Sequence, residues 1–290
     1  MKTPLTPIYR FPDDSPLRHI TIKREDLSET GSHKFRYLKS QLEAFKKQGI
    51  NRVVLSTTGN VGITASHYGK QLGIEVICFM SKKCDMARAA QVEREGGRLI
   101  ISSRPKRFAQ YVSRKYTIPL LRASREDESI LGYRSLGEEL LEQVPEADAI
   151  VNFATSGTSS IGLMKAYEGK KVPALHIAHL EEQGIVRGDE LADLVKKSQG
   201  ALHAVSQEEQ VSAEKILAEY GLETSYEGVC SFAAALKIQD QSSSLVVVFS
   251  GKKWDSSDFI PKCRAETLEE VDQLNYDSIS SNSTAAHSSV

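Results

Sequence analysis

Lys34 is the residue whose type and position most directly suggest covalent chemistry. It lies in the stretch ETGSHKFRYLK, residues 29–39, among small and polar residues where an amphipathic helix should begin. A helix N-terminus carries partial positive charge, and burial disfavours an ammonium group, so a partly buried lysine there should have a lowered pKa. A neutral amine is a nucleophile toward aldehydes. Position alone favours a solvated surface cation, because the chain holds 37 lysine and arginine residues.

Two loops supply groups suited to binding anions. Residues 53–66, VVLSTTGNVGITAS, and residues 150–166, IVNFATSGTSSIGLMKA, each read as a strand, a turn of small hydroxyl residues and a helix start. Hydroxyls, backbone amides and a helix N-terminus then converge on one point. Small polar residues also form plain turns, and neither loop has the glycine spacing of a dinucleotide fingerprint or a P-loop. Taken with Lys34, the loops fit a ligand with an aldehyde and a phosphate, acting on a substrate with a carboxylate.

The elements around these residues alternate between strand-like and helical patterns. In the helix predicted from about residue 34, Phe35, Leu38, Leu42 and Phe45 form one apolar stripe, and Lys34 lies in the first turn beside it. The alternation continues along most of the chain, which predicts parallel sheets covered by helices in two α/β units. The apolar periodicity lapses near residues 122–135, where we place a boundary.

Bulk composition excludes several classes of protein. The chain has 290 residues and a formal net charge of −1, which gives no global attraction to nucleic acid or to an anionic membrane. No signal-peptide core and no apolar run long enough to span a bilayer is found, so a cytoplasmic location is expected. The four cysteines include no CxxC pair, and neither a structural zinc site nor a disulfide framework is predicted.

Five segments in order resemble the fold-type II pyridoxal-phosphate enzymes, the superfamily of tryptophan synthase β-chains, cysteine synthases and threonine synthases. They are KREDLSETGSHKFR (23–36), STTGNVGITAS (56–66), GYRSLGEEL (132–140), ATSGTSSIG (154–162), and the final helix and strand SYEGVCSFAAALK (225–237) and VVVFSG (246–251). The resemblance covers roughly residues 2–255. It implies pyridoxal 5'-phosphate as cofactor.

The same resemblance implies a fold of two three-layer α/β/α domains with mostly parallel sheets and the cofactor in the cleft between them. Residues 1–34 and 131–265 would form the larger cofactor-binding domain, and residues 35–130 the smaller substrate-loop domain. Residues 266–290 are rich in Ser, Asn and Thr, and we expect a disordered tail there.

Carried over position by position, the resemblance makes Lys34 the Schiff-base lysine and then the acid/base that moves the α-proton. Asn60 matches the asparagine on the cofactor's phenolic oxygen, and Ser250 the small hydroxyl residue facing the pyridine nitrogen. The substrate-carboxylate loop corresponds to Thr57, Thr58 and Gly59, and the phosphate loop to Thr155, Ser156, Gly157 and Thr158.

Three other polar positions have competing interpretations. His33 resembles the histidine that helps hold the phosphate in tryptophan synthase β-chains, with a helix cap as the alternative. His176 and His179 lie three apart on a predicted strand and point to opposite faces, so no metal site is predicted. Cys230 is expected to be a buried, inert thiol.

A neutral hydroxyl at Ser250 leaves the pyridine less protonated than a carboxylate would, and the family implication is β-elimination or β-replacement rather than transamination. The expected function is an amino-acid lyase or synthase of the threonine or cysteine synthase type, acting on a serine- or homoserine-derived amino acid, in a homodimer. The alternatives are a non-catalytic relative that binds cofactor or metabolite, and a phosphate-binding α/β protein of another class. Phe35, Val61 and Ser156 depart from common family residues and leave the substrate open.

Overall fold

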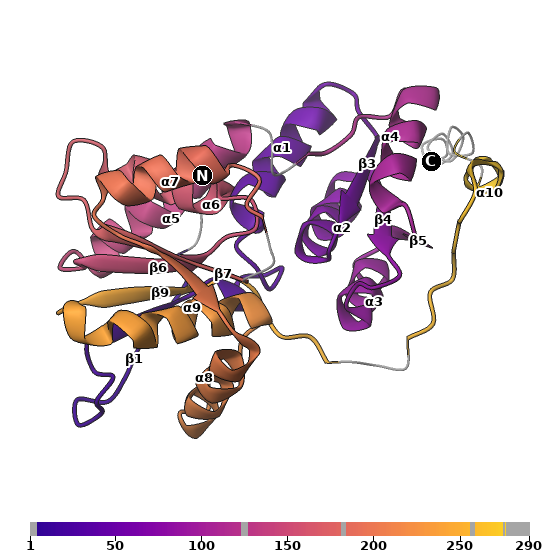
Figure 1. The fold of residues 1–290 in the computed structure, drawn as a ribbon. Coiled ribbons are helices and arrows are strands. Elements are labelled where there is room, and N and C mark those ends of the chain that lie inside the picture. The colour runs from indigo at the N-terminus through magenta and orange to yellow at the C-terminus, as the bar shows by residue number, and fades with distance from the viewer. Residues whose placement is uncertain (1–4, 123–126, 181–183, 256–258, 275, 277–290) are drawn as a thin grey trace, which may run out of the picture.

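The computed structural model describes residues 5–122, 127–180, 184–255, 259–274 and 276. Within them the strands form two sheets (Figure 1). The larger sheet has the order β1 (Ile8–Arg10), β2 (Ile20–Arg24), β9 (Leu245–Phe249), β6 (Ala149–Phe153), β7 (Ala174–Leu180) and β8 (Leu202–Val205). The smaller has the order β3 (Arg52–Thr57), β4 (Glu75–Ser81) and β5 (Arg98–Ser102). Neighbouring strands run parallel, and the described exception is the antiparallel pair β1–β2.

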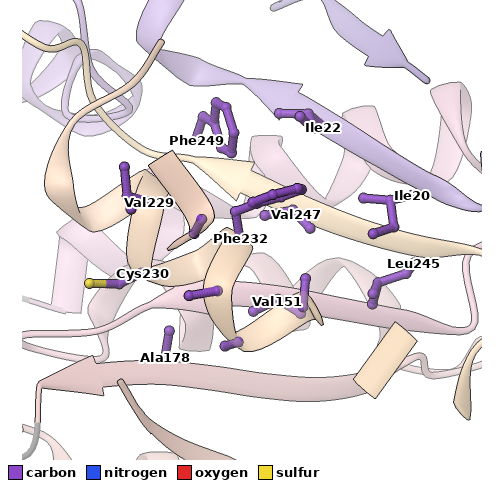
Figure 2. Close-up of a cluster of buried hydrophobic side chains, with 14 of the residues drawn as sticks. Ile20, Ile22, Val151, Ala178, Val229, Cys230, Phe232, Leu245, Val247 and Phe249 are labelled. Atoms are coloured by element: carbon purple, nitrogen blue, oxygen red, sulfur yellow. The ribbon is translucent and has the colours of Figure 1, made fainter. Parts of the chain in front are cut away.

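Side chains of the larger sheet alternate between two helical layers. On β9, Val247 and Phe249 join the core beneath α8 (Gln207–Glu219) and α9 (Tyr226–Ile238). Figure 2 shows both side chains together with Phe232 of α9. Val246 and Val248 pack on the opposite face, against α5 (Asp127–Gln143), α6 (Thr158–Met164) and α7 (Gly188–Lys197). A fully apolar strand buried on both faces is what a central parallel strand requires.

The smaller sheet is also covered on both faces. Helices α1 (Phe35–Lys47), α2 (Asn60–Leu72) and α3 (Met86–Arg94) pack on one face, and α4 (Pro105–Lys115) on the other. Short 3-10 helices η1 (Glu25–Leu27), η2 (Lys165–Tyr167) and η3 (Gln239–Gln241) complete the larger part. The predicted architecture of two α/β units with mostly parallel sheets is confirmed, and the apolar stripe of α1 is buried at Phe35, Leu38 and Leu42.

The C-terminal segment corrects the expectation of a disordered tail from residue 266. Leu268–Gln273 form helix α10, which begins at a capping box between Thr267 and Glu270. Before it, Ala265 N–H donates to the Ile101 carbonyl (3.0 Å), so the chain returns from the larger sheet to the edge of β5. Val271 is buried against the α4 face of the smaller sheet. Residues 277–290 lie outside the described residues, and the predicted domain boundaries stay a prediction.

No helix among the described residues is both long enough and apolar enough to cross a membrane.

Candidate cofactor site

Lys34 lies where the larger sheet meets α1. It is the N-cap residue of α1, one position before the predicted first turn. The segment leading to it is pinned to the end of β9, because the His33 N–H donates to the Ser250 carbonyl (3.0 Å) and Ser32 pairs with Gly251 in an isolated bridge. The lysine is thus placed at the carboxyl end of a central parallel strand, where α/β proteins commonly bind ligands.

One pocket brings together most of the predicted site residues. It encloses about 530 Å³ of space between atoms, part of it open to solvent. The predicted residues that line it are His33, Lys34, Thr58, Asn60, Thr155, Ser156, Gly157 and Ser250. Further lining residues are Val61, Phe153, Ala154, Ser159, Tyr226 and Glu227. Thr57, Gly59 and Thr158 are not among the lining residues.

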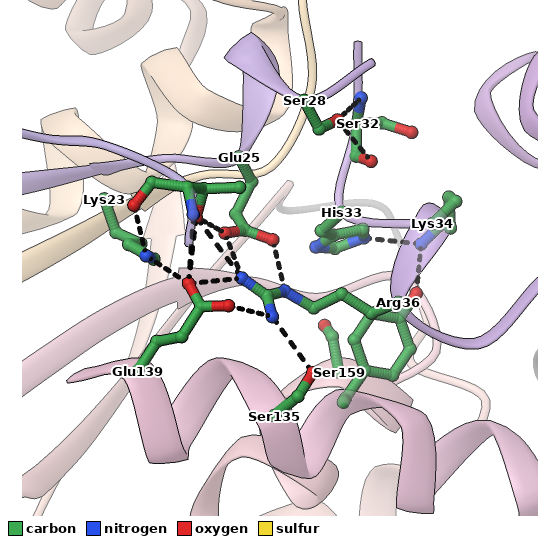
Figure 3. A network of polar contacts seen from close by, with 12 residues as sticks. Lys23, Glu25, Ser28, Ser32, His33, Lys34, Arg36, Ser135, Glu139 and Ser159 are labelled. Atoms are coloured by element: carbon green, nitrogen blue, oxygen red, sulfur yellow. Dashed lines mark hydrogen bonds and ion pairs between the residues drawn. The ribbon is translucent and has the colours of Figure 1, made fainter. Parts of the chain in front are cut away.

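The amine of Lys34 has two polar neighbours. Its Nζ lies 2.6 Å from Nε2 of His33 and 3.3 Å from the hydroxyl of Tyr133 (Figure 3). Burial of the amine lowers the pKa of Lys34 to about 8, while the charge of Glu227 opposes this shift and that of Arg88 adds to it. The lowered pKa agrees with the sequence-based expectation, but its main cause is burial. A substantial fraction of the amine is therefore neutral near physiological pH.

We expect the reactivity of Lys34 toward an electrophile to rise with pH and level off above about 8. Only the neutral amine is nucleophilic, so its reaction rate should increase about tenfold per pH unit between about pH 6 and 7. Competitive acetylation of the apoprotein, quantified by mass spectrometry of the Lys34 peptide with Nα-acetyl-lysine in the same mixture, measures this. A midpoint for Lys34 equal to that of the free lysine derivative would contradict the lowered pKa of this half-buried amine.

The side chain of Thr57 holds the first predicted anion loop in shape, and neighbouring residues of that loop line the pocket. The Thr57 hydroxyl accepts hydrogen bonds from the amides of Gly59 (3.0 Å) and Gly62 (3.3 Å), so this side chain shapes the loop. Gly59 has φ +144°, and a Cβ there would lie 2.5 Å from the Arg88 side chain. Only glycine fits this position. Thr58 and Asn60 are left to face the pocket.

The second predicted loop wraps the start of α6. Gly157, in the left-handed region at φ +81°, precedes Thr158, whose hydroxyl lies 3.1 Å from that of Ser156. The carbonyls of Thr155 and Ser156 accept hydrogen bonds from the backbone of residues 186 and 187 (3.1 and 3.0 Å), which fixes the loop. Its hydroxyls and the amides of the first helical turn form a cradle of the kind that binds phosphate.

These residues fit a ligand that carries an aldehyde and a phosphate. His33 Nδ1 is buried and has no hydrogen-bond partner among the described residues, so it could donate to such a ligand, and the Asn60 side chain lines the same pocket. A side chain at Gly251 would clash with Asn60 Nδ2 at 2.9 Å and crowd Ser225 Oγ at 3.1 Å, which shows how closely the strand end approaches the Asn60 amide. Lys34, Asn60, Ser250 and the α6 cradle thus surround one space.

A buried ion pair forms part of the pocket wall. Glu227 on α9 accepts two hydrogen bonds from Arg88 on α3, at 2.9 and 2.7 Å, and both residues are buried. Coulombic and hydrogen-bond contacts with Arg88 outweigh burial and hold the pKa of Glu227 below its usual value. No local sequence pattern predicts this pair, because the two residues lie 139 positions apart.

A second buried network holds the start of α1 (Figure 3). Arg36 donates to Glu25 (2.6 Å) and to Glu139 (2.9 Å), and Lys23 Nζ lies 2.6 Å from Glu139. All four side chains are at most 7 % exposed, and two cations balance two carboxylates. Ser135 also accepts from Arg36 (2.9 Å), so the Ser and Glu of the GYRSLGEEL motif converge on one guanidinium two residues after Lys34.

The remaining predicted positions lie away from the pocket lining. His176 Nδ1 lies 2.9 Å from His203 Nε2, and His179 Nδ1 donates to the Leu180 carbonyl at 3.0 Å. Cys230 is buried within α9, and burial raises the pKa of its thiol to about 12. These side chains contact other protein groups and do not line the pocket.

This chain is similar to known proteins in both sequence and fold. The family model described as pyridoxal-phosphate dependent enzyme matches residues 1–251. A tryptophan synthase β-chain of Acinetobacter calcoaceticus is 26% identical over 209 residues, 63% of this chain and 52% of that protein. A tryptophan synthase β-chain of Leptospira biflexa is 25% identical over 225 residues, which are 69% of this chain and 57% of that protein. The chain thus spans about half the length of these curated relatives.

Solved structures share the fold at low sequence identity. An O-ureido-L-serine synthase variant with O-ureido-L-serine bound gives a TM-score of 0.76 at 17% identity, over 85% of this chain and 87% of that one. A pyridoxal 5'-phosphate-dependent aspartate racemase gives a TM-score of 0.72 at 18% identity, over 81% of this chain and 84% of that one. Maize serine racemase gives a TM-score of 0.71 at 20% identity, over 81% of this chain and 84% of that one. The neighbours therefore include a synthase and two racemases.

Proposed function

This chain belongs to the family of pyridoxal-phosphate dependent enzymes, of fold type II, and we propose that it is an amino-acid lyase or synthase that catalyses β-elimination, β-replacement or threonine-synthase-type chemistry. Lys34 is the proposed attachment point of the cofactor. The proposed substrate is a small serine- or homoserine-derived amino acid, and the proposed assembly is a homodimer.

The observation that carries this proposal is Ser250, a neutral hydroxyl residue that lines the pocket at the end of β9. A carboxylate facing the cofactor ring nitrogen would favour transamination, whereas a hydroxyl leaves that nitrogen less protonated. Glu227 is the carboxylate among the described lining residues, and both of its oxygens are held by Arg88. Ser250 is therefore the better candidate to face the ring nitrogen.

The residues present could hold pyridoxal phosphate in one orientation. The amine of Lys34 would attach to the aldehyde, and the loop at Ser156 and Gly157 would bind the phosphate through its hydroxyls and amides. Asn60 would donate to the phenolic oxygen. When bound, the cofactor supplies stabilisation of negative charge on the substrate α-carbon.

The chain itself supplies binding, orientation and proton transfer. Thr58 and the backbone at the start of α2 would hold the substrate carboxylate, and Thr57 keeps that loop in shape. The neutral amine of Lys34 would take the α-proton, and its protonated form would return a proton to the product or leaving group. A pKa of about 8 leaves both forms of the amine accessible near neutral pH.

A substrate screen tests the proposal. We expect the holoprotein to change its near-visible absorption with one of serine, O-acetylserine, O-phosphohomoserine and threonine, and to release a keto acid or a replacement product from it. Parallel incubation in heavy water reports exchange of the substrate α-proton. Omission of cofactor gives the background.

Two outcomes would replace the proposal. Inversion of the α-carbon without any loss of the β-substituent would identify a racemase, the activity named for two of the structural neighbours. Cofactor binding with no α-proton exchange on any of the four amino acids would favour the second candidate, a non-catalytic relative that serves as a binding protein. Phe35, Val61 and Ser156, which depart from common family residues, leave the substrate open.

A further inference from the structure

Tyr133 on α5 touches the nitrogen of Lys34, although the sequence motifs give it no role. Its hydroxyl is 3.3 Å from Nζ, and the ring centroid is 5.7 Å from the same atom. The side chain is almost completely buried, with 2% exposed. The phenol therefore meets the one atom of Lys34 that would react.

Close helix packing fixes this ring. A Cβ at Gly132 of α5 would lie 2.4 Å from the Tyr37 side chain of α1, and one at Gly162 of α6 would lie 2.6 Å from that of Tyr133. Glycine at both positions lets α5 approach α1 and α6 closely. The ring is further contacted by His33 and Tyr37, at centroid distances of 5.1 and 5.3 Å. These contacts restrict the side chain to one orientation.

His33 and Tyr133, the two polar neighbours of the Lys34 amine, differ in their protonation and hydrogen-bonding roles. Burial, with the charges of Lys34 and Arg36, lowers the pKa of His33 well below its usual value, so the ring is neutral and its Nε2 can accept a hydrogen bond from Nζ. Burial raises the pKa of Tyr133 well above its usual value, and the phenol keeps its proton. An ammonium at Lys34 can donate to both neighbours at once.

We propose that Tyr133 is a catalytic residue whose hydroxyl accepts a hydrogen bond from Lys34 once the amine has taken up a proton, and thereby strengthens the amine as a base. This proposal rests on the proposed function, in which the amine of Lys34 takes its proton from the substrate α-carbon. That proton moves from the substrate α-carbon to Nζ, the C–H electron pair stays on the substrate, and the phenol O–H bond remains intact. Hydrogen bonds to ionised groups are stronger than neutral ones, so the contact favours the ammonium.

Other charges also act on the amine and stay in place when the phenol is altered. Glu227 of α9 raises the pKa of Lys34, and Arg88 of α3 lowers it. Arg36 of α1 and Glu25 beside it act on the neighbouring His33 and Tyr133. A change confined to the Tyr133 hydroxyl therefore isolates one hydrogen bond.

The test is the acetylation midpoint of Lys34 in the apoprotein of the variant Tyr133→Phe. We expect the midpoint to fall from about 8 by about one pH unit, a tenfold loss of proton affinity. Tyr167→Phe is the matched control. Tyr167 is also buried, its hydroxyl has no hydrogen-bond partner among the described residues, and it packs in the cluster around α5 and α6. The control should leave the Lys34 midpoint unchanged.

An unchanged or raised midpoint in a folded Tyr133→Phe protein would overturn the proposal. If that variant does not fold, 3-fluorotyrosine in place of Tyr133 keeps the hydroxyl and provides a single ¹⁹F resonance. In a pH titration, we expect the chemical shift of this resonance to change with the same midpoint as Lys34. A chemical shift with no inflection at that pH would equally overturn the proposal. Neither measurement uses cofactor or substrate, so failure of the proposed lyase activity would leave their results interpretable.

Discussion

Lys34→Ala is expected to abolish covalent attachment of pyridoxal phosphate and to lower turnover by about 10²–10⁴-fold, the usual contribution of a positioned acid/base group. The amine lies in the pocket with Ser250 and the α6 loop, and its lowered pKa makes it nucleophilic near neutral pH. The measurements are the near-visible absorbance of the reconstituted protein and product release from the substrate that responds in the screen. Both should be lost together.

Lys39→Ala is the matched control for this experiment. Lys39 lies on the same helix and is exposed, so the variant should retain colour and turnover. A Lys34→Ala protein that keeps the absorption of a covalently bound cofactor would assign the linkage to a different lysine.

Glu139→Gln is expected to destabilise the protein by about 3–5 kcal/mol, the cost of removing one partner from a buried ion pair. Glu139 contacts Lys23 at 2.6 Å and Arg36 at 2.9 Å, and without its charge Glu25 alone would balance two buried cations. Although burial acts in the opposite direction, contacts with Arg36 and Lys23 hold the pKa of Glu139 below its usual value. The stabilisation is therefore present at neutral pH and is lost as the pH falls through the folded-state pKa.

Thermal unfolding of the apoprotein measures this effect. For a chain of this size the expected loss corresponds to a fall in Tm of roughly 10 °C. Glu138→Gln is the neighbouring control, because Glu138 is 55% exposed and pairs only with Arg134 one helical turn away among the described contacts. Its effect should be within about 0.5 kcal/mol. Equal effects of the two variants would show that the buried network adds no stability.

Features that depend on neighbouring residues were predictable from the sequence. Alternating strand and helix patterns predicted the parallel sheets, and the stripe beginning at Phe35 predicted the buried face of α1. The hydroxyl-rich turns before residues 60 and 158 predicted loops at helix starts, and the structure places Thr58 and Ser156 from these loops in one pocket. Each of these signals is contained in a short stretch of chain.

Contacts between distant segments were not predictable in this way. Arg36 meets Glu139 across 103 positions, and Arg88 meets Glu227 across 139, so neither pairing has a local pattern. The expected disordered tail was judged from its polar composition, but a capping box at Thr267 and the burial of Val271 order α10. Thr57 stays a predicted residue of the substrate-carboxylate loop, and the contact of its hydroxyl with the Gly59 amide is a detail that the sequence did not reveal.

Peptide mapping after borohydride reduction of the reconstituted protein tests the central claim most directly. Reduction makes a lysine-linked cofactor permanent, and mass spectrometry then identifies the modified residue. The account predicts one pyridoxyl group per chain, on Lys34. A pyridoxyl group on another lysine, or no covalent group in a folded protein saturated with cofactor, would contradict it.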